Sequence, residues 1–252
     1  MTLVLYKDKT HACLVFNDLV TGEAVQANQF LIVDHAHAAI IDPGGELTYT
    51  RLYMELGKWV DVRGLDYVIA SHQDPDIVAS LNRWLVGTQC KAVVPELWER
   101  FIPHFTSVGR TQGRMIAIPD QGANLMLGDI HLKALPAHFL HAEGNFQFYD
   151  PISKVLFSGD MGANLASGDL DKPFKRLPEA LPFMEGFHQR YMSGNKACRY
   201  WANMVRTLDI KWMVPQHGRP FKGKKVIHQF LDWISDLHCG VDLVTQDTYR
   251  VP

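Results

Sequence analysis

One stretch organises the chain: Tyr67-Val68-Ile69-Ala70-Ser71-His72-Gln73-Asp74-Pro75-Asp76-Ile77. Its first four residues are apolar and predict a buried strand, and three potential metal ligands follow at alternate positions: His72, Asp74 and Asp76. Polar residues that directly follow a buried strand lie at the edge of a sheet, where α/β proteins bind ligands. Pro75 biases Asp74 away from helical angles, so an extended turn can bring the three side chains to one or two ions.

Taken alone, the same stretch also fits a polar turn in which Asp76 caps a helix from Ile77 to Leu85. Four further segments favour the metal-site reading, because each places a His or Asp beside a strand-like apolar run. They are Ile40-Ile41-Asp42-Pro43-Gly44, Phe139-Leu140-His141-Ala142-Glu143-Gly144-Asn145-Phe146, Val155-Leu156-Phe157-Ser158-Gly159-Asp160 and Met213-Val214-Pro215-Gln216-His217-Gly218.

In this order the motifs resemble those of the metallo-β-lactamase superfamily. The pattern there is His-x-(His/Glu/Asp)-x-Asp-His, then a His before a small-residue turn, an Asp after an apolar strand, and a late His-Gly. The similarity extends roughly from Gln29 to Gly218. It implies an α/β fold, the αββα sandwich, in which two mixed β-sheets pack face to face with helices on the outer faces. We expect one such domain over residues 1–252.

The resemblance also implies a dinuclear metal site made of three histidines and three aspartates. One metal would be held by His72, Asp74 and His141, and the other by Asp76 and His217. Asp160 would bridge the two metals, and Asp42 would support the site from beneath without coordinating. Oxygen-rich imidazole sites suit iron, manganese or zinc.

Two departures from the superfamily pattern point to its di-iron branch. Asp74 stands where hydrolytic zinc members usually carry His and di-iron members carry a carboxylate. Ile77 replaces the His that usually completes the second metal, which leaves an open position for O2, NO or water. The sequence is therefore most similar to flavodiiron proteins and their stand-alone relatives, the oxygen-binding di-iron proteins, and we expect two Fe ions, with Zn or Mn as alternatives.

Flavodiiron proteins carry a C-terminal flavodoxin domain that supplies electrons. Residues 218–252 leave no room for such a domain, so O2 or NO reduction would require an external electron donor. Reversible O2 binding by a sensor that acts on a signalling partner is the other expectation. Three residues near the motifs are candidates to hydrogen-bond bound dioxygen: Gln73, His188 and Tyr191.

Two other functions fit the same residues. One is a hydrolase that cuts a phosphodiester, thioester or lactone with a metal-bound hydroxide. The other is a binding module with a degenerate, metal-free site, of which Asp74 and Ile77 would be signs. Iron content and absorption that depends on O2 distinguish the di-iron protein from both of these alternatives.

Composition and charge limit the partners and the cellular location that we expect for the protein. A net charge of -2 gives no reason to expect nucleic acid or an anionic membrane as a partner. The four cysteines are far apart and form no CxxC pair, which suits a reducing compartment. No apolar run reaches membrane-spanning length and the first ten residues do not form a signal peptide, so we expect a cytoplasmic protein. Apolar residues from Leu181 to Met184 suggest a possible homodimer face.

Overall fold

The computed structural model describes residues 2–20, 22, 24–166 and 171–252. The strands are β1 Thr2–Lys7, β2 His11–Phe16, β3 Gln29–Asp34, β4 His37–Ile41, β5 Tyr67–Ile69, β6 Lys91–Pro95, β7 Met115–Ile118, β8 Ala123–Leu127, β9 Ile130–Pro136, β10 Phe146–Asp150, β11 Val155–Phe157, β12 Trp212–Val214 and β13 Phe221–Lys222. The α-helices are α1 Glu46–Leu56, α2 Pro75–Val78, α3 Leu81–Gly87, α4 Glu96–Glu99, α5 Leu181–Tyr191, α6 Asn195–Val205 and α7 Lys224–Asp236.

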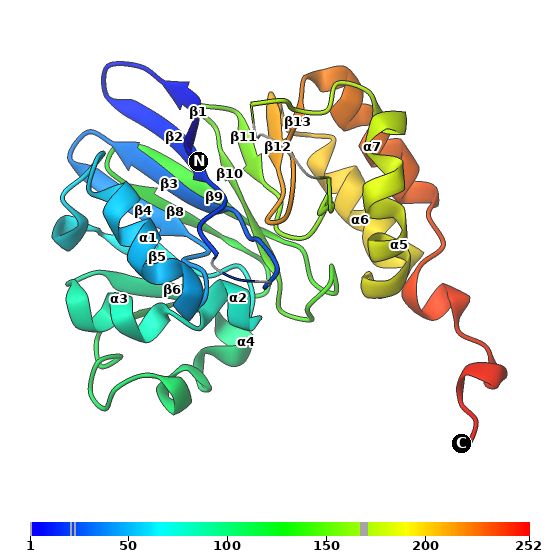
Figure 1. The fold of residues 1–252 in the computed structure, drawn as a ribbon, viewed down its shortest axis with the longest axis horizontal. Coiled ribbons are helices and arrows are strands. Elements are labelled where there is room, and N and C mark those ends of the chain that lie inside the picture. The colour runs from blue at the N-terminus through cyan, green and yellow to red at the C-terminus, as the bar shows by residue number, and fades with distance from the viewer. Residues whose placement is uncertain (1, 21, 23, 167–170) are drawn as a thin grey trace.

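The strands form two mixed sheets, as the sequence predicts. The first has seven strands in the order β1 to β7, antiparallel from β1 to β4 and parallel from β4 to β7. The second has six strands in the order β13-β12-β11-β10-β9-β8, in which only β11 and β12 run parallel. Figure 1 shows α1 and α3 outside the first sheet and α5, α6 and α7 outside the second.

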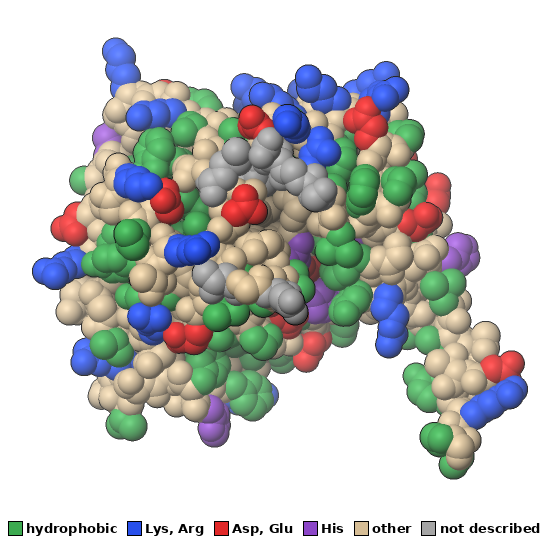
Figure 2. Space-filling model, viewed as in Figure 1, with side chains coloured by type: hydrophobic (Ala, Val, Ile, Leu, Met, Phe, Trp, Pro, Cys, Tyr) green, Lys and Arg blue, Asp and Glu red, His purple; other side chains and the backbone are tan. Residues whose placement is uncertain are grey.

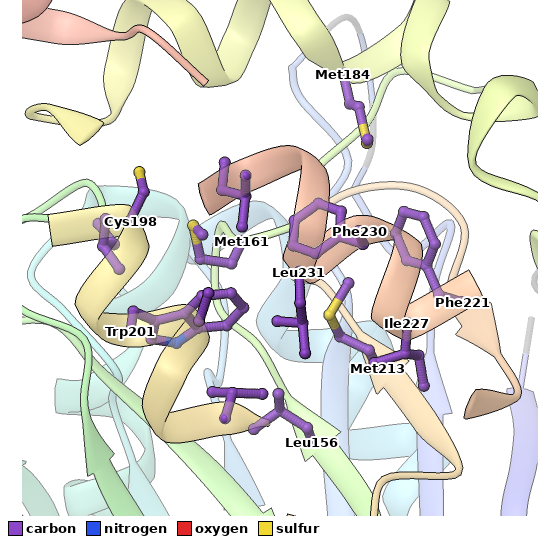
Figure 3. Close-up of a cluster of buried hydrophobic side chains, with 14 of the residues drawn as sticks. Leu156, Met161, Met184, Cys198, Trp201, Met213, Phe221, Ile227, Phe230 and Leu231 are labelled. Atoms are coloured by element: carbon purple, nitrogen blue, oxygen red, sulfur yellow. The ribbon is translucent and has the colours of Figure 1, made fainter. Parts of the chain in front are cut away.

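Alternation along the strands explains why both faces of each sheet are apolar. In β3, Phe30 and Ile32 belong to the core between the two sheets, whereas Leu31 belongs to the core beneath α1 and α3. A third core lies between the second sheet and α6 and α7, where Trp201 and Phe230 pack with neighbouring apolar side chains (Figure 3). The αββα sandwich is therefore held by three apolar layers.

One predicted helix differs in the structure. The apolar spacing predicts a single helix from Ile77 to Leu85, but the chain forms two short helices, α2 and α3, with a break at Ala79 and Ser80. Ser80 explains the break, because its N–H donates to the Gly44 carbonyl at 3.1 Å and its hydroxyl donates to the same oxygen at 2.6 Å. These contacts attach the end of α2 to the turn that follows β4.

Candidate metal centre

The six predicted ligands follow strand ends that lie at one edge of the two sheets. His72, Asp74 and Asp76 follow β5, Asp160 follows β11, and His217 follows β12. Parallel pairing of β11 with β12 brings the last two turns together, because the carboxyl ends of parallel strands meet at the same edge. His141 lies in the loop between β9 and β10.

The structure brings all six side chains together in two groups joined by Asp160. In the first group, His141 Nε2 lies 3.0 Å from Asp160 Oδ2 and 3.3 Å from Asp74 Oδ2. His72 Nε2 lies 3.3 Å from the same Asp160 oxygen and 3.7 Å from Asp74 Oδ2.

The second group uses the other oxygen of Asp160. His217 Nε2 lies 3.5 Å from Asp160 Oδ1 and 3.4 Å from Asp76 Oδ2. Each half therefore holds imidazole nitrogen and carboxylate oxygen, and one carboxylate contributes an oxygen to both.

Contacts outside the two groups orient the histidine rings. His217 Nδ1 donates to the Gln26 carbonyl oxygen at 2.8 Å, and His72 Nδ1 lies 3.0 Å from the Ser71 hydroxyl. In both rings Nε2 is left to face the centre, which is the arrangement that outer contacts impose on metal-binding histidines. Beneath His72, the Ser71 N–H donates to Asp42 Oδ1 at 2.8 Å, and burial raises the pKa of Asp42 to about 6.

The charges of the centre call for a cation. The nearby carboxylates of Asp160 and then Asp74 raise the pKa of His141 to about 10, and contacts with His141 and His72 lower the pKa of Asp74. Burial raises the pKa of Asp160, but the three histidines outweigh it and lower the net value. Asp160 Oδ2 is buried and accepts no hydrogen bond of good geometry despite its close histidine nitrogens. Divalent metals would replace the histidine protons and fill that acceptor, so these residues fit a dinuclear centre.

A cavity of about 920 Å³ opens over the two groups. Its floor includes Asp74, Asp76, His141, Asp160 and His217, and much of its wall is apolar. Figure 2 shows histidine and acidic side chains in a hollow near the middle of one face. A small ligand can thus reach the centre from an apolar chamber.

The three residues predicted to contact bound dioxygen lie in different places. Tyr191 lines the cavity, with its ring 5.6 Å from that of His141 and stacked on Phe187 at 4.7 Å. Gln73 is exposed and is not among the lining residues described.

His188 is fully buried, and both of its ring nitrogens have backbone partners. The Gly162 N–H donates to Nε2 at 2.9 Å, and Nδ1 donates to the Met184 carbonyl at 2.8 Å. Burial lowers the pKa of His188 to about 4, which matches a neutral ring that donates from one nitrogen and accepts at the other. His188 thus connects α5 to the loop that carries Asp160, and neither nitrogen is left for a ligand in the cavity.

The structure contradicts the alternative in which Asp76 caps a helix. Helix α2 begins at Pro75, and Asp74 occupies its N-cap position without a side-chain hydrogen bond to the helix. Both carboxylates are therefore left to face the histidines. The side chain of Ile77 is buried in the core beneath α1 and α3.

Two contributors to the centre were missed in the sequence. Gln26 lies 191 positions from His217, and its backbone carbonyl carries no signal in its residue type. Phe187 was not singled out, because its stretch from Gly186 to Met192 fits either helical packing or a wall over the metal site. Its stacking on Tyr191 and the ring of His141 at 6.4 Å favour the wall.

The fold and its paired ligand groups define a metallo-β-lactamase-fold protein. A family model described as "ODP family beta lactamase" matches residues 25–218. The chain belongs to this family.

Solved structures of similar proteins agree with this assignment. A structure described as a peroxy diiron species of chemotaxis sensor ODP is 36% identical with a TM-score of 0.87, and the match covers 98% of this chain and 99% of that one. The apo state of chemotaxis sensor ODP from T. denticola is 34% identical with a TM-score of 0.86, covering 99% of both chains. A flavo di-iron protein variant from Thermotoga maritima shares the fold at 20% identity and a TM-score of 0.74, covering 93% of this chain and 60% of that one.

Curated relatives are longer proteins. An uncharacterized protein of Methanocaldococcus jannaschii is 24% identical over an alignment of 238 positions that covers 88% of this chain and 56% of that protein. A protein of Synechocystis described as a diflavin flavoprotein is 42% identical over 201 residues, 76% of this chain and 32% of that protein. The chain spans about half the length of the first relative and about a third of the second.

Proposed function

We propose that the protein binds two iron ions and uses them to bind O2. The observation that carries this proposal is the division of the Asp160 carboxylate between the two ligand groups, Oδ2 toward His72 and His141 and Oδ1 toward His217. A second support is the 36% identity to a chemotaxis sensor described as a diiron species.

The proposed ligands divide as the distances do. His72, Asp74 and His141 would hold one metal, Asp76 and His217 the other, and Asp160 would bridge them. Hard carboxylates and neutral imidazoles suit iron, and the described lining residues include no cysteine that would favour zinc. When bound, the iron pair supplies the electrons that O2 needs to bind.

The residues of this chain would bind, orient and shield. The hydrogen bonds from His217 to Gln26 and between His72 and Ser71 fix the two rings, so that Nε2 of each meets its metal. The stacked pair of Phe187 and Tyr191 covers His141 and limits the entry of water. The Tyr191 hydroxyl is the candidate to donate a hydrogen bond to bound dioxygen.

We further propose a sensing role, because both ODP structures are described as a chemotaxis sensor and one of them as its peroxy diiron species. An external electron donor, NO as a ligand, a homodimer and a cytoplasmic location stay predictions. Among the residues the structure describes, no helix is long and apolar enough to cross a membrane. We propose O2 binding ahead of hydrolysis, because the two ODP structures are described as a chemotaxis sensor.

The test begins with protein expressed with added iron and purified without oxygen. We expect two iron atoms per chain and a new visible absorption when O2 is admitted, lost again in the double variant Asp76→Ala, Asp160→Ala. The variant Asp236→Ala is the matched control, because this aspartate is exposed at the end of α7 and belongs to neither ligand group.

Stoichiometric zinc with no absorption that depends on O2 would refute the iron proposal. Turnover of a model phosphodiester that disappears in the double variant would favour the hydrolase instead. Protein that stays free of metal, with a melting temperature that Fe and Zn leave unchanged, would mean that the centre binds no metal.

A further inference from the structure

Two of the four cysteines lie side by side in the core behind the second sheet. Cys198 is on α6 and Cys239 follows α7, and their Sγ atoms are 3.8 Å apart although 41 positions separate them in the sequence. Both side chains are fully buried and free. Figure 3 shows Cys198 with Trp201 on one helix at the side of the apolar cluster there. Cys13 and Cys90, in contrast, belong to the two other cores.

The backbone around this pair is held on both sides. The N–H groups of Cys239 and Asn195 both donate to Asp242 Oδ2, at 3.1 and 2.6 Å, which fastens the Cys239 turn to the start of α6. Gly240 has a φ of +50°, and a Cβ there would lie 2.1 Å from the Met192 carbonyl oxygen. The turn therefore packs backbone against backbone, which holds the two cysteines in contact.

We infer that Cys198 and Cys239 form a reversible dithiol–disulfide site. The two Sγ atoms are already in contact at 3.8 Å. A disulfide bond of about 2.05 Å therefore requires them to approach by less than the diameter of one atom. This inference uses neither the metal centre nor the proposed binding of O2. It concerns a pair that sequence reading dismissed, because 41 residues of separation carry no pairing signal.

The oxidant for this site would be a small-molecule disulfide such as oxidised glutathione. The Cys239 thiolate attacks one sulfur of the oxidant, forms a mixed disulfide and releases one glutathione thiolate. The Cys198 thiol then loses its proton to the released glutathione thiolate, and the resulting Cys198 thiolate attacks the Cys239 sulfur and releases the second glutathione. The protein loses two hydrogens and the oxidant gains them. A hydrogen bond from the Cys198 thiol lowers the pKa of Cys239, which favours it as the first nucleophile.

The bond would fasten the C-terminal segment, residues 239–252, to the body of the protein. Residues 241–252 are exposed, and Figure 1 shows this segment leading away from the helices. Two backbone hydrogen bonds connect this segment to the loop that carries His141. The Val241 N–H donates to the Ser193 carbonyl at 2.9 Å, and the Ser193 N–H donates to the Phe139 carbonyl at 3.2 Å. Phe139 lies two residues before His141. Local opening of the same exposed segment gives the oxidant access to Cys239.

The experiment equilibrates the full chain, without oxygen, in glutathione buffers of graded redox potential, followed by acid quenching and alkylation of free thiols. We expect two of the four thiols to resist alkylation under oxidising conditions and a non-reduced digest to contain one cross-linked peptide pair, joining Cys198 to Cys239. Because the bond closes a loop of 41 residues, the melting temperature should rise by roughly 10 °C and return on reduction.

The variants Cys198→Ala and Cys239→Ala should each abolish the cross-link, whereas Cys90→Ala, also a buried cysteine, should leave it unchanged. Four alkylated thiols at every potential would overturn the inference, provided that the unfolded chain is oxidised in the same buffers. A cross-link through Cys13 or Cys90, or glutathione that stays attached to Cys239, would overturn it as well. None of these results depends on iron content, so the inference and the proposed function can fail separately.

Discussion

Replacing His11 with Leu tests a buried ionic network that joins the two sheets. His11 Nε2 lies 2.8 Å from Asp150 Oδ2 on β10, and Nδ1 lies 3.1 Å from Asp34 Oδ1 on β3. Removing one partner of a buried ion pair leaves uncompensated charge and costs about 3–5 kcal/mol. Both carboxylates keep other donors, such as the Asp129 N–H on Asp34 and the Ile152 N–H on Asp150. We therefore expect a loss near the lower end, about 3 kcal/mol, or about 6–12 °C in melting temperature.

The loss should depend on pH in a defined direction. Burial lowers the pKa of His11, but Asp150 and Asp34 outweigh it and raise the net value above the ordinary 6.5. The stability that protonated His11 contributes is fully present below pH 6.5 and is lost as pH rises through the raised value. The free energies of unfolding of the wild type and His11→Leu should therefore converge as the pH rises from 6.5 through that raised value.

The assay is urea unfolding of metal-free protein across that range, with His131→Leu as the control because this histidine is exposed on β9. A difference between wild type and His11→Leu that stays constant with pH would refute the reasoning, because it would mean that His11 is neutral in the folded protein. A difference under about 1 kcal/mol at pH 6 would show that the remaining donors satisfy both carboxylates.

Three further changes act closer to the centre. Asp160→Asn should lower iron content from two atoms per chain to less than one, since it removes the charge shared by both ligand groups; metal analysis that still finds two would contradict the bridging role. His188→Leu should destabilise the fold by about 1–3 kcal/mol, because the buried Gly162 N–H loses its acceptor; unchanged urea unfolding would show that water or the backbone replaces the ring. Tyr191→Phe keeps the stacking on Phe187, and should speed O2 dissociation by up to about tenfold if the hydroxyl holds the ligand; an unchanged rate excludes that contact.

That these six side chains lie close together could be predicted because most of them follow the end of a strand, whereas their binding of metal stays a prediction. An apolar run that ends in a His or Asp places that side chain at a sheet edge, and the order of the motifs brings the edges together. The two sheets with helices on their outer faces were expected from the resemblance to the metallo-β-lactamase superfamily, and the structure confirms them. What the sequence could not show are contacts between distant segments, such as Gln26 with His217. Ser80 with Gly44, which breaks a helix that spacing alone predicts, is another example.

The candidates for contact with dioxygen were chosen because they lie near the ligand motifs in the sequence. The alternation of side chains along an extended chain would have separated Gln73 from the ligands on either side of it. His72 and Asp74 face the centre, so Gln73 between them points the other way and is exposed. His188 and Tyr191 are three apart on α5 and share part of a helix face, but His188 lies deeper and reaches the backbone of the Asp160 loop. The residue types of His188 and Tyr191 indicated polar contacts for both. Their depth within the fold determines whether the partner is the backbone, as for His188, or the cavity, as for Tyr191.

The packing of Ile77 explains why the second ligand group contains one histidine, whereas the first contains two. Position 77 follows Asp76 within α2, where its N–H donates to the Asp74 carbonyl at 2.9 Å and its carbonyl accepts from the Gly44 N–H at 3.1 Å. The Ile77 side chain is buried among the apolar residues beneath α1 and α3. An imidazole at this position would have to leave that core to reach His217, and a buried polar group without a partner is costly. Packing behind the first sheet therefore favours isoleucine, and its consequence at the proposed centre would be a metal position with fewer protein ligands and more room for O2.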